Sequence, residues 1–217
     1  MTTEPELLDQ TVVVIGGSAG IGLETARHAR REGADVVLTG RDPERLERAA
    51  LDLDARSTAA FDANDHASLK RFFEALPGPI DHVMVTAGGP HYGPLLEMDA
   101  DQVRRGISEH VVRSLEVARN AAGKMRPGGT LLLMGGTGGR KISRDLGIAS
   151  AATAALPPFT AALALELAPV RVNLIAAGFV DTPLSASLLG DGLEARRDEL
   201  RAALLTTTVD VPRAGLP

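Results

Sequence analysis

Short apolar runs alternate along the chain with longer segments of helical period. The runs at residues 11–15, 35–40 and 81–89 are typical of buried strands. After the first two, apolar residues recur every three or four positions, as on one face of a helix. This alternation is typical of βα units that wind a parallel sheet. The pattern therefore predicts an α/β protein with a doubly wound parallel sheet.

Local signals set further boundaries. Asp42 followed by Pro43 is a helix start, and Asp65 is suited to cap a helix that runs through Leu76. We find no linker or repeat and expect a single domain over residues 1–217, with a flexible N-terminus at 1–9 and an irregular or truncated end at 206–217. The pattern also predicts strands at 57–61, 130–136 and 170–178, helices at 101–125, 148–167 and 192–205, a stop at 127–129, and at most a short extended piece at 207–211.

Composition narrows the function classes. Among 217 residues, 23 Lys and Arg stand against 28 Asp and Glu, so the net charge of −5 supplies no basic field for nucleic acid or anionic membranes. No apolar run approaches the roughly 18 residues of a membrane span, and the acidic N-terminus does not resemble a signal peptide. We expect a cytoplasmic protein. The chain has no Cys, and its five His show no metal-ligand spacing, so no metal site is predicted.

A glycine-rich loop, GGSAGIG at residues 16–22, ends the first strand and opens the first helix. At such a position, backbone amides and the helix dipole attract a phosphate, and glycines permit a tight turn and close approach of a pyrophosphate. The second strand ends in Gly40-Arg41, where NAD-binding folds usually carry an acid. The guanidinium without a carboxylate favours NADP over NAD. Arg41 as a merely solvated or capping side chain is the alternative.

The glycine loop, Ala87-Gly88 and the segment LALELAPVRVNLIAAGFVDTP at 163–183 together resemble the short-chain dehydrogenase/reductase family, a Rossmann-type NAD(P)-binding family. The resemblance covers Thr11 to about Leu184. Ile15 replaces a common Thr, Val85-Thr86 replace two asparagines, and Ala177 replaces a Pro. The cofactor-binding residues that the motif and the resemblance imply are Gly16, Ser18, Gly20, Ile21, Gly22, Arg41, Asp62, Ala87, Gly88 and Thr182.

The same resemblance implies an Asn-Ser-Tyr-Lys catalytic set, from which this sequence departs. The register places the Asn position at His110 and the Ser position at Gly136. The Tyr and Lys positions fall on Ala149 and Thr153, and neither side chain can act as an acid or base near neutral pH. The sole Tyr of the chain, Tyr92, is far away in sequence, so no shift of register restores the set.

Two substitute centres remain as catalytic candidates. His110 carries an imidazole that titrates near neutral pH, and Tyr92 follows His91 in the loop after the fourth strand, where open α/β sheets bind ligands. A packing role for His110 and a surface role for Tyr92 are the alternatives.

The leading hypothesis is an NAD(P)(H)-dependent oxidoreductase that transfers hydride between nicotinamide and a small carbonyl or alcohol substrate, as a homodimer or homotetramer. The alternative is a catalytically inactive dinucleotide-binding protein with a regulatory or structural role.

Overall fold

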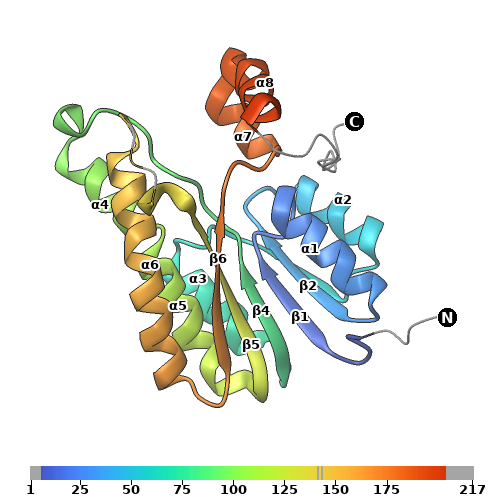
Figure 1. Cartoon of the computed structure of the whole chain (residues 1–217). Coiled ribbons are helices and arrows are strands. Elements are labelled where there is room, and N and C mark those ends of the chain that lie inside the picture. The colour runs from blue at the N-terminus through green and yellow to red at the C-terminus, as the bar shows by residue number, and fades with distance from the viewer. Residues whose placement is uncertain (1–5, 141, 143, 204–217) are drawn as a thin grey trace.

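Six parallel strands form one sheet in the order β3-β2-β1-β4-β5-β6. The structure is a computed structural model that describes residues 6–140, 142 and 144–203. The observed order confirms the predicted doubly wound parallel sheet (Figure 1). The strands are β1 (Thr11–Ile15), β2 (Asp35–Gly40), β3 (Ser57–Ala60), β4 (Ile80–Val85), β5 (Met125–Gly136) and β6 (Arg171–Ala177).

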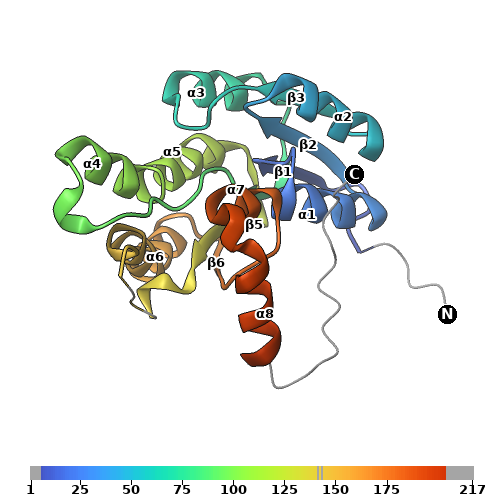
Figure 2. The ribbon, with the colours of Figure 1, turned by 90° about the horizontal axis from the view of Figure 1, so that it is seen from above.

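Helices cover both faces of this sheet. On one face lie α1 (Gly20–Arg31) and α2 (Pro43–Leu53), and on the other α3 (His66–Ala75), α5 (Val111–Ala121) and α6 (Gly147–Glu166). Beside α6 packs α4 (Ala100–Ser108). Beyond the carboxyl ends of the strands lie α7 (Pro183–Leu189) and α8 (Leu193–Ala203), as Figures 1 and 2 show. Short 3-10 helices lie at Leu95–Glu97, Ala122–Lys124, Thr137–Gly139 and Gly190–Gly192.

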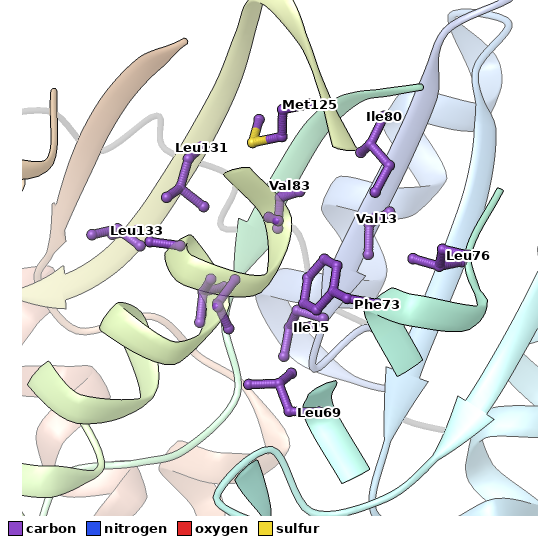
Figure 3. Packing of buried hydrophobic residues seen from close by; sticks show 14 of the residues in the cluster. Val13, Ile15, Leu69, Phe73, Leu76, Ile80, Val83, Met125, Leu131 and Leu133 are labelled. Atoms are coloured by element: carbon purple, nitrogen blue, oxygen red, sulfur yellow. The ribbon is translucent and has the colours of Figure 1, made fainter. Parts of the chain in front are cut away.

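The core consists of two apolar clusters, one on each side of the sheet. The larger cluster joins strand residues such as Val13 and Val83 to Phe73 of α3 and to residues of α5 and α6 (Figure 3). The smaller joins β1 and β2 to α1 and α2 through residues such as Leu38 and Leu46. These clusters fix the carboxyl ends of the strands, where the predicted site residues lie.

The helix predicted over 101–125 is wrong as one element, because the chain forms α4 and α5 with a turn between them. At this turn the His110 N–H donates to the Ile107 carbonyl three residues back, at 3.2 Å. Gly106 and Ser108 just before it are weaker helix formers than Ala or Leu. The break places His110 at the start of α5 rather than inside a helix.

Two other boundaries also differ. The stop predicted at 127–129 lies within β5, where a register irregularity against β4 between Ile80 and His82 accommodates Pro127 and two glycines. Helix α7 was not predicted, although Thr182 caps it and Pro183 is its first residue. In the described part of the chain β6 is an outer strand. The predicted extended piece at 207–211 and the end at 206–217 lie outside the described residues.

One described helix, α6, is long and apolar enough to cross a membrane by length and composition, which the sequence expectation did not anticipate. Its Ile148, Leu156 and Leu163 are buried. It packs against β5, β6 and α5, so here it is a core helix of the domain.

Candidate functional site

The glycine loop folds tightly at the carboxyl end of β1. Gly16 has φ +98°, and its N–H and that of Gly17 point to the Thr39 carbonyl of β2 at 3.2 and 2.8 Å. A Cβ on Gly22 would lie 2.2 Å from the Gly16 carbonyl oxygen, so the helix can approach the strand closely only because residue 22 lacks a side chain. The loop therefore has the compact form that the sequence motif predicts.

The first helix begins without a side-chain cap. Its N-cap is Ala19, whereas Asp42, Asp65 and Asp99 cap the starts of α2, α3 and α4 with their carboxylates. An N-terminus that no side chain caps presents backbone N–H groups and the positive end of the helix dipole to an anion. Ile21 lies in this first turn and is partly buried. The loop and helix start therefore fit a pyrophosphate.

Thr86 holds the loop in place, a role that sequence reasoning missed. Its hydroxyl donates to the Gly16 carbonyl at 3.0 Å, and the Ile15 carbonyl lies 3.3 Å away as a second acceptor. The Ala87 N–H also donates to the Ile15 carbonyl, at 2.9 Å. The residue that replaces an asparagine of the family motif thus ties the exit of β4 to the exit of β1.

The end of β2 carries Arg41, whose side chain is exposed. Within the described residues no carboxylate lies within ion-pair distance of its guanidinium. The Ser18 hydroxyl packs against Gly40, where a Cβ would lie 2.8 Å from the Ser18 Oγ. Any side chain at position 40 would require Ser18 to move. With Gly40 followed by Arg41, the strand end presents a guanidinium and no acid.

Asp62 and Thr182 lie on the exits of two other strands. Asp62 is exposed and its Oδ1 accepts the Asn64 N–H at 2.9 Å, which shapes the turn after β3. Thr182 caps α7 after β6, and a Cβ on Gly20 would lie 3.4 Å from the Thr182 side chain. The fold thus brings the glycine loop together with a residue 162 positions later in sequence (182 minus 20).

Three positions of the expected catalytic set, those of its Ser, Tyr and Lys, lie together, but they carry no acid or base. A Cβ on Gly136 would lie 3.4 Å from the Thr153 Cγ2. The Thr153 hydroxyl donates back to the Ala149 carbonyl at 2.9 Å, and Ala149 is buried. The adjacent Ser150 hydroxyl is buried without a hydrogen-bond partner among the described residues. Proton transfer at this place needs a group from elsewhere.

His110 is partly buried at the start of α5, and its Nδ1 has no hydrogen-bond partner among the described residues. Burial lowers the pKa of His110, and the positive charge of Arg113 adds to this effect. The Gly106 carbonyl and the Glu109 carboxylate oppose it. The imidazole is thus held toward its neutral form, in which it accepts a proton.

The loop after β4 brings a second imidazole to the same turn. The Nε2 of His91 lies 3.1 Å from the Oε2 of Glu109. Tyr92 is half exposed, and burial of the rest of its ring raises the pKa of the phenol, which makes it a weaker acid. The structure therefore gathers His91, Glu109 and His110, whereas the sequence pointed to His110 and Tyr92. Among the described residues no group of three or more acidic or His side chains is arranged to hold a metal.

Comparison with known proteins identifies the family. Residues 16–212 match the family described as enoyl-(acyl carrier protein) reductase. Over 189 residues the chain is 30% identical to short-chain dehydrogenase/reductase ATR9 of Stachybotrys chlorohalonatus, a match that spans 80% of this chain and 75% of that protein. The chain belongs to the short-chain dehydrogenase/reductase family.

Solved structures agree with this assignment. The crystal structure of BdcA in complex with NADPH is similar, with a TM-score of 0.76, 26% identity, and coverage of 82% of this chain and 74% of that one. A short chain dehydrogenase from Burkholderia cenocepacia in complex with NADP gives a TM-score of 0.80 with 25% identity, and the match covers 88% of this chain and 82% of that one. These matches confirm the predicted Rossmann-type fold and the predicted class, an NAD(P)-dependent short-chain oxidoreductase.

Proposed function

We propose that this short-chain dehydrogenase/reductase binds NADP(H) and interconverts a small carbonyl compound and its alcohol. One observation carries the proposal: the glycine loop opens onto an uncapped helix start beside a strand end, Gly40-Arg41, that carries a guanidinium and no carboxylate. The nicotinamide of the bound cofactor supplies or accepts the hydride. The residues of the chain then have two tasks, to bind the cofactor and to move a proton at the substrate oxygen.

The residues present fit this cofactor. Backbone N–H groups of the loop and of the first turn of α1 would hold the pyrophosphate, and the similar structures that contain NADPH or NADP support this use of the fold. Arg41 would pair with the 2′-phosphate, in a charge-assisted contact that NADH does not offer. The remaining proposed contacts come from the loop itself and from three strand exits: Gly16, Ser18, Gly20, Ile21, Gly22, Asp62, Ala87, Gly88 and Thr182.

Proton transfer falls to the turn between α4 and α5. His110 is held neutral and can accept a proton, and the Nε2 of His91 lies at the same turn, 3.1 Å from the Glu109 carboxylate. Tyr92 stays a candidate, although the direction of its pKa shift disfavours it as a donor. This arrangement would replace the Tyr and Lys of the family with imidazoles on a neighbouring element.

A catalytically inactive dinucleotide-binding protein is the second candidate. Its support is specific, because Gly136, Ala149 and Thr153 lie together without any acid or base. Such a protein would bind NADP(H) as tightly as an enzyme does and would turn over no substrate.

A titration of nicotinamide fluorescence with NADPH and NADH tests the cofactor assignment. Loss of a charge-assisted phosphate contact costs about 1.5–3 kcal/mol, so Arg41→Ala should weaken NADPH binding roughly 10- to 150-fold and leave NADH binding unchanged. Arg56→Ala is the matched control, since Arg56 is exposed and pairs with Asp35 at the opposite end of β2. Equal affinity of the wild type for NADPH and NADH would contradict the assignment.

A panel of carbonyl and alcohol substrates then separates the two candidate functions. If the protein is an enzyme, removal of its acid or base should lower kcat roughly 10²- to 10⁴-fold, in His110→Ala or in Tyr92→Phe. Ser150→Ala and Thr153→Val are controls at and beside the positions of the expected Tyr and Lys and should keep full activity. Binding of NADPH without turnover of any substrate would favour the inactive protein.

We also propose a homodimer or homotetramer in the cytoplasm. The apolar helix α6 is only 44% buried, and Leu165 on it is 83% exposed. A partly uncovered apolar helix is suited to a subunit contact. Light scattering of the wild type and of Leu165→Glu tests the assembly, since the charged variant should dissociate.

A further inference from the structure

Besides the exposed Arg41, a buried arginine lies behind the loops that follow β3 and β4. Arg113, in the first turn of α5, is 4% exposed, and its Nη1 donates to the Asn64 Oδ1 at 2.9 Å. Its Nε has no hydrogen-bond partner, and within the described part of the chain no carboxylate lies within ion-pair distance of the guanidinium. A fully buried cation whose hydrogen-bond partner is a neutral amide is rare, because burial of an unpaired charge costs several kcal/mol.

The guanidinium lies between two of the proposed cofactor loops. A Cβ on Gly88 would lie 2.2 Å from the Arg113 Nη2 and 2.7 Å from its Cζ, so the planar group packs directly on this glycine. Gly88 follows β4 with φ +94°, and Asn64 follows Asp62 on the exit of β3. Any side chain at residue 88 would displace Arg113, so the position of the guanidinium depends on the glycine.

The surrounding charges leave this cation undercompensated. Burial, with a smaller contribution from the positive charge of Arg41, lowers the pKa of Arg113 to about 10. The carboxylates of Glu109 and Asp62 act in the opposite direction without reversing the shift. Glu109 is already paired with His91, and Asp62 is exposed to solvent. Arg41 and Arg113 thus repel each other, and a dianion near both would lower the energy of the pair.

We propose that Arg113 is a second cation for the 2′-phosphate of NADP(H), acting from behind the cofactor loops together with Arg41 at the surface. The inference rests on the proposed function. It assigns to α5 a part in cofactor selection that no glycine motif reveals. The glycine loop, GGSAGIG at residues 16–22, contains no basic residue, and Arg113 would supply the second cation from another element.

Two variants test whether Arg113 acts on the 2′-phosphate, and they separate that role from a purely structural one. Arg113→Gln removes the charge and keeps a polar side chain. Asn64→Asp keeps Arg113 but gives it a carboxylate partner from the protein at the position of the present amide. Both should weaken binding of NADPH and of adenosine 2′,5′-bisphosphate by about tenfold or more, while NADH and AMP bind within twofold of wild type. Neither should lower the melting temperature of the ligand-free protein, because both relieve an unpaired buried charge.

Arg119→Gln on the same helix is the matched control, since Arg119 is exposed and pairs with Glu116. A structural role for Arg113 would instead lower the melting temperature and weaken all four ligands alike, and that result would overturn the proposal. Unchanged NADPH affinity in both variants would overturn it as well, while a wild-type preference for NADPH would still uphold the proposed function. If the wild type itself shows no preference for NADPH, the proposed cofactor is wrong and Arg113 has no phosphate to select.

Discussion

Gly20→Val separates the cofactor role of the glycine loop from its structural role. Gly20 has φ +54°, a left-handed conformation that disfavours any side chain, and its substitution should cost about 1–3 kcal/mol in the free energy of unfolding. Domains of this size retain about 5–15 kcal/mol, so the variant stays folded, with a melting temperature lower by roughly 2–12 °C. A Cβ at this position already lies 3.4 Å from Thr182, and the two methyl groups of Val extend beyond it.

Those methyl groups would fill the space between the loop and Thr182 that close approach of a pyrophosphate requires. We expect NADPH affinity to fall by at least about 100-fold, measured by fluorescence titration, with a circular dichroism spectrum like that of wild type. Gly128→Val is the matched control: Gly128 has φ +81° with no atom within 4 Å of a Cβ, so the variant carries the strain without filling the loop. If the Gly20→Val variant binds NADPH as tightly as the control variant does, the assignment of the loop to pyrophosphate binding is refuted.

Three further predictions concern stability. The buried Asp81 carboxylate accepts the Thr11 N–H at 2.9 Å and pairs with the Arg126 Nε at 2.8 Å, so Asp81→Asn should lower the free energy of unfolding in urea by about 1–3 kcal/mol, and an unchanged midpoint would contradict this. The pKa of His110 is lowered from 6.5 in the folded state, so the unfolded chain binds more protons and stability should fall as pH drops below about 6.5; His110→Asn should lessen that fall, and an identical pH profile would argue against it. Ser150→Ala should leave the melting temperature unchanged or raise it, because the wild-type hydroxyl is buried without a partner among the described residues; a clear decrease would reveal a missed contact.

Elements marked by local chemistry could be predicted from the sequence. Asp42 and Asp65 begin their helices with the expected carboxylate caps, at 3.0 Å to the Arg45 N–H and 3.1 Å to the Ala67 N–H. The glycine loop follows β1, as its motif indicates, because turn and cap preferences act over a few residues. The signal for α7, Thr182 before Pro183, was of the same local kind and was overlooked.

What sequence reasoning missed depends on contacts between distant segments. The Thr86 hydroxyl meets the Gly16 carbonyl across 70 residues, and Arg113 meets Asn64 across 49. The turn at Glu109 and His110 is set by packing between α4, α5 and α6 as well as by weak helix formers. Periodicity predicts which face of a helix is apolar, but it does not predict which side chain of a neighbouring loop will meet that face.

The contact between Ser18 and Gly40 constrains the order in which cofactor preference can change. A carboxylate at position 40 is the simplest route from NADP toward NAD, yet its Cβ would lie only 2.8 Å from the Ser18 Oγ. Substitutions at touching positions do not act additively. Gly40→Asp alone would therefore disturb Ser18 and the loop before it gained a ribose contact. After Ser18→Gly, the Cβ of the same residue would meet only the Leu46 Cδ1, at an ordinary contact distance of 3.6 Å. We therefore expect a change of cofactor preference to require residue 18 to change first, and a library that varies position 40 by itself would miss that path.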